Sequence, residues 1–228
     1  MSRRKRVCPA GELFLEFNRS IVRMTLFEKL EDYDACQRVL QATWDRLPLP
    51  ILAMVVMPNH WHFVVRPTTD DQVREFFRLM TVTHTMCWHA HDHTRGIGHL
   101  DPRRFNSFPV QSDEHSLKVI QYVERNPLRA KLVKSAEEWQ ASSAWVRRQR
   151  STAAGGWLTL PTDPPIPRRW RTWVNQPESE AEVRAIRSCI RRGSPFGSEA
   201  MARNSVIRLG LVPTRRPRGR RKKHRKES

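Results

Sequence analysis

Two histidines separated by a single residue lie in a stretch of apolar residues that favours a β-strand. His60 and His62 flank Trp61 in the segment 57–65, which reads Met-Pro-Asn-His-Trp-His-Phe-Val-Val. Successive side chains of a strand point to opposite faces, so both imidazoles are expected on the same face. Taken alone, this pattern is more typical of a polar strand face than of a ligand site. Its chemical meaning depends on a second motif further along the chain.

The second motif combines a tyrosine with an asparagine. The chain has only two tyrosines, and Tyr33 fits the core spacing of an early helix. Tyr122 and Asn126 are four residues apart, so on a helix they share a face. Pro127 discourages that helix from continuing unchanged through Asn126. A phenol and an amide oxygen are therefore expected to point toward one spot, which without the histidines would be an ordinary helix surface.

The four side chains together suit chemistry on a phosphate. Two imidazoles and one amide oxygen can hold a divalent metal with open positions, and such a metal polarises a phosphate oxygen. A tyrosine hydroxyl can act as the nucleophile, although it needs a nearby cation or a base that the sequence does not identify. Attack on a DNA phosphodiester would leave a 5'-phosphotyrosine and a free 3'-hydroxyl. The covalent link conserves the bond energy, so rejoining the strand needs no ATP.

Hydrophobic periodicity and turn residues predict the elements that position these side chains. Strands are expected at 11–18, 51–57, 60–65 and 105–111, and helices at 28–47, from 70 to 88 and from 114 onward. Residues 95–106 are expected to form a loop. The order βαββαβα predicts an α+β fold in which an antiparallel sheet has helices packed on one side. A further pair of helices is expected at 181–192 and 198–209.

Changes in composition divide the chain into five parts. These are a basic N-terminal arm (1–10), the sheet domain (11–135), a strap or linker rich in Trp, Arg and Pro (136–180), a helical hairpin (181–211) and a disordered basic tail (212–228). The tryptophans of the strap are expected either to anchor it to the domain surface or to stack on unpaired bases. The helical hairpin is either a small DNA-binding module or a plain hairpin packed on the body.

Positive charge is concentrated at the two ends of the chain. The net charge is +18, from 41 Lys and Arg against 23 Asp and Glu, and residues 213–228 hold nine basic residues and one acidic residue. Cationic arms of this kind favour a polyanion such as nucleic acid, although a merely solubilising tail is the alternative. No apolar run is long enough to span a membrane, and the four cysteines form no close pair. We expect a cytoplasmic, nucleoid-associated protein with reduced thiols.

The histidine and tyrosine motifs in combination resemble those of the single-tyrosine HUH transposases of insertion sequences. They are most similar to the chromosomal relatives of that group, the REP-associated tyrosine transposases. The resemblance rests on segments 57–62 and 122–133, and it continues through 98–100, 104–105, 108–114, 138–139, 191–199, 209–211 and 216–220. It therefore covers nearly the whole chain. It implies an HUH-type sheet of the ferredoxin or RRM-like kind, with a basic helical C-terminal extension.

The resemblance also implies a role for each residue of the two motifs. His60, His62 and Asn126 would be ligands of a divalent metal, Mg²⁺ or Mn²⁺, and Tyr122 would be the nucleophile. The substrate would be single-stranded DNA, as a hairpin of an extragenic palindromic repeat, cleaved and rejoined by a monomer or homodimer. Candidate DNA contacts are arginines of the loop, of the tyrosine motif and of the tail: Arg95, Arg103, Arg104, Arg125, Arg129, Arg215, Arg216, Arg218, Arg220 and Arg221.

Three other hypotheses stay open. A domesticated protein could keep the fold and bind DNA hairpins without cutting them, but the intact histidines, tyrosine and asparagine favour an enzyme. An HUH nuclease of the replication-initiator or conjugative type is disfavoured, because those families usually carry accessory domains that the sequence lacks. A structural zinc site is the third hypothesis, disfavoured because its candidate ligands lack the spacing of such sites. These candidates are Cys87, His89, His91, His93 and His99.

Overall fold

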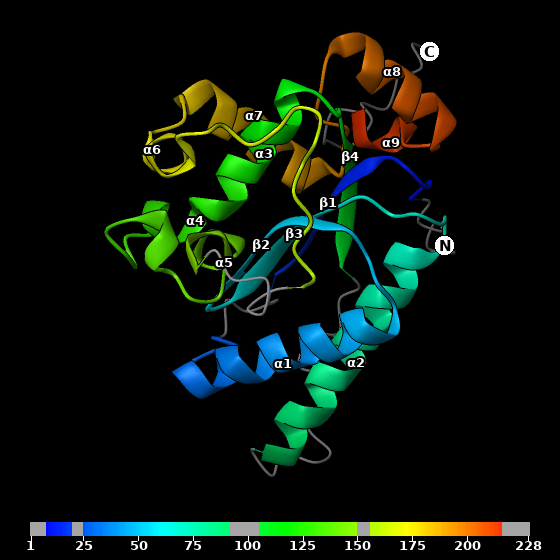
Figure 1. Ribbon diagram of the computed structural model, residues 1–228. Helices are drawn as coiled ribbons and strands as arrows, with labels where there is room; N and C mark the ends of the chain where they lie inside the picture. The colour runs from blue at the N-terminus through cyan, green and yellow to red at the C-terminus, as the bar shows by residue number, and fades with distance from the viewer. Residues whose placement is uncertain (1–7, 20–24, 92–104, 150–155, 216–228) are drawn as a thin grey trace, which may run out of the picture.

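A four-stranded antiparallel sheet forms the centre of the computed structural model (Figure 1). The structure describes residues 8–19, 25–91, 105–149 and 156–215, without the side chains of Arg19, residues 84–91 and Arg215. The strands are β1 (Leu13–Arg19), β2 (Ile51–Met57), β3 (His60–Val65) and β4 (Asn106–Val110), in the spatial order β2-β3-β1-β4. The predicted α+β class and the βαββαβα order are confirmed.

The strands β2 and β3 form a tight hairpin. Pro58 and Asn59 are its two-residue turn, and Met57 pairs with His60 in the antiparallel register. Because a two-residue loop fixes the register of a hairpin, the faces of β3 are determined by the turn. This is the break that the sequence predicted between the two apolar runs.

Helices cover both faces of the sheet (Figure 1). On one face lie α1 (Leu30–Arg46) and α2 (Gln72–His91), and on the other α3 (Glu114–Glu124) and α7 (Glu180–Arg192). The expectation that helices pack on one side is therefore wrong. The physical reason is visible in β2, where all seven residues are apolar and buried, so each face of the strand needs a cover.

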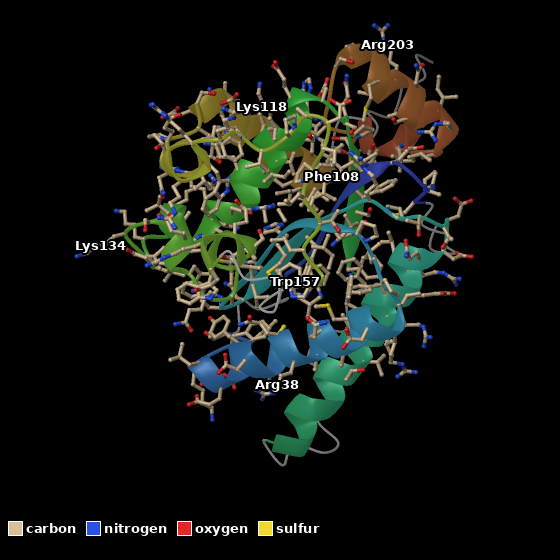
Figure 2. All side chains as sticks on the ribbon, viewed as in Figure 1. Arg38, Phe108, Lys118, Lys134, Trp157 and Arg203 are labelled. Carbon is tan, nitrogen blue, oxygen red and sulfur yellow. The ribbon has the colours of Figure 1, made fainter. Side chains whose placement is uncertain are left out.

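Each face of the sheet has its own apolar core. Phe63 of β3 packs with Phe77 of α2 in the first core, where Trp157 of the strap is also buried. In the second core, Ile120 of α3 and Ile186 of α7 pack with Phe108 of β4. Figure 2 labels Phe108 and Trp157 among the crowded side chains of the interior. Helix α7 is thus packed on the body of the protein, while DNA binding by the hairpin stays a prediction.

Shorter helices follow the sheet domain. They are α4 (Asn126–Arg129), the 3₁₀-helix η1 (Ala136–Glu138), α5 (Ser143–Gln149), α6 (Trp170–Asn175), α8 (Glu199–Arg208) and α9 (Val212–Arg215). The strap follows the free edge of β2, where the Val56 amide donates to the Ala141 carbonyl at 2.9 Å. The indole of Trp139 donates to the Val56 carbonyl at 2.8 Å. Trp139 therefore anchors the strap to the domain.

The opposite edge of the sheet is also covered. Gly193 ends α7 in the left-handed conformation, with φ of +68°, which a glycine adopts without strain. The chain then turns so that Phe196 pairs with β4, and the Gln111 amide donates to the Phe196 carbonyl at 2.9 Å. Covered edges leave fewer backbone groups free to pair with another chain.

Two further findings concern the cysteines and the helices of the described residues. Cys8, Cys36 and Cys189 are buried and form no disulfide with one another, and burial raises the pKa of Cys36 to about 12. In the part of the chain that the structure describes, no helix is both long and apolar enough to cross a membrane.

Candidate active site

The two histidines of β3 lie side by side on the face of the sheet that α3 covers. Their ring centroids are 5.1 Å apart, with the rings nearly perpendicular. Trp61, between them in sequence, points to the opposite face and stacks on Phe77 of α2 at 5.1 Å. The alternation predicted for this strand is therefore confirmed. His62 is buried with 4% of its surface exposed, whereas His60 is partly exposed near the hairpin turn.

Helix α3 carries Tyr122 over these histidines. The helix begins after Asp113, whose carboxylate accepts a hydrogen bond from the His115 amide at 2.8 Å and caps the first turn. Val119 and Val123 are fully buried under the helix and hold it on the sheet. The Tyr122 ring lies edge-on to His62, with 6.1 Å between the ring centroids, and only 5% of Tyr122 is exposed.

Asn126 reaches the same place from the start of the next helix. α3 ends at Glu124, and Pro127 occupies the first turn of α4, where its missing N–H costs nothing. The Asn126 Nδ2 atom lies 3.3 Å from Nε2 of His60. The structure thus brings His60, His62, Tyr122 and Asn126 to one place, while their chemical roles stay predictions.

Asn59 is a member of this site that the sequence did not single out. Its Oδ1 atom lies 2.7 Å from Nδ1 of His60. In this orientation the amide oxygen accepts, which corresponds to the His60 tautomer with its proton on Nδ1 and a lone pair on Nε2. The Nε2 atom is the one that faces Asn126. The signal for Asn59 was available, because it directly precedes His60 in the tight turn of the hairpin.

The donor atoms present fit a divalent cation. Neutral imidazole nitrogens and an amide oxygen are ligands that proteins use for such ions. The amide of Asn126 faces His60 through its nitrogen, and rotation of the amide group would present its oxygen instead. Among the described residues no group of three or more His, Cys, Asp or Glu could hold a metal. The side chains of the alternative zinc site around Cys87 lie outside the described residues.

Removing the Asn59 amide is expected to weaken metal binding. With Asn59→Ala, His60 loses the acceptor that fixes its proton on Nδ1, and loss of such a partner lowers metal affinity about 10- to 100-fold. Titration of Mn²⁺ by calorimetry measures this, and Asn59→Asp, which retains an acceptor, serves as the control. Equal affinity of wild type and Asn59→Ala would show that this interaction does not orient a metal ligand.

A buried carboxylate fixes the end of the helix that carries Tyr122. Glu124 is fully buried, and its Oε1 atom accepts from Ser143 at 2.6 Å and from Nε of Arg147 at 2.9 Å. Its Oε2 atom accepts from the Trp170 indole at 3.1 Å. These contacts tie the last turn of α3 to α5 and α6. Both carboxylate oxygens of Glu124 therefore have hydrogen-bond partners, as burial of a charged group requires.

Three of the arginines predicted to contact DNA lie in described segments, and the others do not. Arg125 and Arg129 follow Tyr122 and both pair with the carboxylate of Glu178. Arg215 ends α9. The remaining candidates lie outside the described residues: Arg95, Arg103, Arg104, Arg216, Arg218, Arg220 and Arg221. DNA contact by these residues therefore stays a prediction.

Comparison with known proteins finds a family model that matches the segment holding this site. Residues 19–126 match the model described as "Transposase IS200 like", and this segment includes His60, His62, Tyr122 and Asn126. The matched segment, just under half of the chain, is similar to the IS200-like transposases. The resemblance to single-tyrosine transposases that the motifs indicated is thereby confirmed. No curated protein matches the sequence.

Solved structures agree with this assignment at the level of the fold. A REP-associated tyrosine transposase bound to a REP hairpin is 18% identical, with a TM-score of 0.51, over 78% of this chain and 93% of that one. The likeness therefore extends beyond the matched segment and shows a shared fold. A candidate transposase from Deinococcus radiodurans is 16% identical, with a TM-score of 0.37, over 55% of this chain and 97% of that one. A TM-score that low carries no argument.

Proposed function

We propose that the protein cleaves and rejoins single-stranded DNA at palindromic repeat hairpins through a covalent bond to Tyr122. The observation that carries the proposal is the convergence of Tyr122 and Asn126 on the paired histidines of β3. The IS200-like family match supports the reaction class. The hairpin in the similar REP-associated structure supports the form of the substrate.

The reaction needs one nucleophile and a held phosphate. The Tyr122 hydroxyl gives up its proton as its oxygen attacks a phosphodiester phosphorus. The bond from phosphorus to the 3' oxygen breaks, and the departing oxygen takes up a proton. The product is a 5'-phosphotyrosine with a free 3'-hydroxyl, and attack by a 3'-hydroxyl reverses the step. His60, His62 and Asn126 would hold Mg²⁺ or Mn²⁺. When bound, such an ion polarises a phosphate oxygen and neutralises negative charge.

A denaturing-gel assay tests the proposal. Purified protein is mixed with labelled hairpin oligonucleotides that carry single-stranded flanks from the host's palindromic repeats, with Mg²⁺, Mn²⁺ or EDTA. We expect a slow-migrating protein–DNA band that forms only with metal. Hairpins that bind and yield no band with either metal would instead establish the domesticated DNA-binding protein. The proposal applies equally to a monomer and to a homodimer, and a cytoplasmic, nucleoid-associated location belongs to it.

The basic tail is expected to contribute to DNA binding through its charge. Deleting residues 216–228 leaves α9 in place and removes most of the positive charge of that end. For every phosphate that the tail neutralises, its deletion should reduce the slope of log affinity against log salt by about 0.7 for a single strand. Binding measured at several salt concentrations tests this, with a tail of the same length in which Gln replaces Lys and Arg as a second variant. An unchanged slope in both would mean that the tail does not touch DNA.

A further inference from the structure

Arg129 holds Tyr122 by its backbone and by its ring at once. Its two terminal nitrogens donate to the Tyr122 carbonyl at 3.4 and 3.3 Å. Its guanidinium carbon lies 4.4 Å from the centroid of the Tyr122 ring, within the range of a cation–π contact. The Tyr122 ring therefore lies between Arg129 and the edge-on ring of His62. A displacement of Arg129 would therefore change the position of the Tyr122 ring.

A carboxylate from a distant part of the chain fixes Arg129. Glu178 pairs with Arg129 and, at 3.0 Å, with Arg125. The side chain of Glu178 is only 4% exposed, and each arginine side chain is 15% exposed. Burial lowers the pKa of the Arg129 guanidinium from its ordinary value, and the Glu178 carboxylate opposes this shift. Glu178 thus holds two neighbouring guanidinium groups in place.

The segment that carries Glu178 is itself fastened to α3. It lies between α6 and α7, and the Gln121 side chain donates to the carbonyls of Trp173 at 2.7 Å and Gln176 at 3.2 Å. One turn earlier on α3, Lys118, labelled in Figure 2, pairs with Glu182 of α7 at 3.1 Å. Contacts on both sides of Glu178 therefore hold the segment at a fixed place along the helix.

We infer that Glu178 and Arg129 are positioning residues for the Tyr122 ring, so the chain beyond the sheet domain sets the geometry of the nucleophile. This inference rests on the proposed function of Tyr122 for its catalytic consequence. Without the Glu178 charge, Arg125 and Arg129 would repel each other in a poorly hydrated place. Arg129 would then leave the Tyr122 ring, and a small misplacement of a reacting group lowers its rate strongly.

The chain offers a readout of ring position that needs no DNA. Its only two tyrosines are Tyr33 and Tyr122, so protein labelled with 3-fluorotyrosine gives two fluorine resonances, assigned with Tyr122→Phe. In Glu178→Gln we expect the Tyr122 resonance to shift or broaden while that of Tyr33 stays in place. Glu180→Gln is the matched control. Glu178 and Glu180 both line an open pocket of about 400 Å³, and each substitution removes one negative charge. Among the described residues, Glu180 pairs only with the exposed Arg184.

The same variants are compared in the covalent attachment assay. With hairpin at saturating concentration, Glu178→Gln should lower the rate of attachment about 10- to 100-fold, and Glu180→Gln should match the wild type. Thermal melts confirm that each variant is folded, and if Glu178→Gln unfolds, Arg129→Gln, which removes the contact with the ring itself, is measured in the same way. An unmoved Tyr122 resonance in the folded variant overturns the inference. Absence of attachment in the wild type would contradict the proposed function instead, and the fluorine spectra would still decide the inference.

Discussion

Tyr122→Phe is expected to abolish covalent attachment of DNA and to leave hairpin binding nearly unchanged. Phenylalanine has no oxygen with which to form a phosphotyrosine, so attachment should fall at least about 10³-fold, as for other enzymes that lose a nucleophile. The ring itself remains, and so do its contacts with His62 and Arg129. A denaturing gel measures attachment, and a native gel measures binding by the same protein.

Tyr33→Phe is the matched control for this prediction. Tyr33 is buried in the core on the opposite face of the sheet, and its hydroxyl donates to the Phe27 carbonyl at 3.2 Å. Its burial also raises its pKa to about 12, with Asp32 adding to the shift, so it is a poor nucleophile. The control should attach DNA like the wild type. Persistent attachment by Tyr122→Phe, or its loss in Tyr33→Phe, would mean that the nucleophile has been misassigned.

Glu124→Ala is expected to destabilise the whole domain. The change leaves Arg147, whose side chain is 6% exposed, without its carboxylate partner, and it removes the acceptor of Ser143 and Trp170. Breaking a buried ion pair by removing one partner costs about 3–5 kcal/mol of the free energy of unfolding. For a chain of this size the melting temperature should fall by roughly 10 °C. Thermal unfolding followed by circular dichroism measures it.

A variant that preserves the shape of the group separates charge from packing at this site. Glu124→Gln keeps an acceptor oxygen and a similar volume, so it should lose less stability than Glu124→Ala. The exposed carboxylate of Glu180 provides the contrasting case, because Glu180→Ala should change stability by less than about 1 kcal/mol. Melting temperatures that are equal for Glu124→Ala and wild type would show that the cluster does not anchor α3.

Much of the candidate site was predictable because local rules determine it. Alternation along a strand placed His60 and His62 on one face, and spacing along a helix placed Tyr122 near Asn126. The two-residue turn at Pro58 and Asn59 fixed the register of the hairpin. Each of these inferences needs only neighbouring residues, so no long-range contact could overturn it.

The sequence was least informative where distant segments meet. The helices cover both faces of the sheet because β2 is buried on both sides. The apolar run of β2 indicates burial, but it does not say which helices cover which face. The pairing of Glu178 with Arg125 and Arg129 joins residues about fifty positions apart. An isolated glutamate in a polar stretch has no periodicity or motif, so nothing in the sequence indicated that it would lie beside the nucleophile.

Mass spectrometry of the covalent product identifies the residue that attacks the DNA. Wild-type protein is allowed to react with hairpin DNA and metal, and the product is digested with nuclease and trypsin. We expect a nucleotide phosphate on the peptide 119–125, in which Tyr122 is the only hydroxyl-bearing residue. A nucleotide found on the peptide 30–38, which contains Tyr33, or on any peptide without Tyr122, would contradict the assignment of the nucleophile.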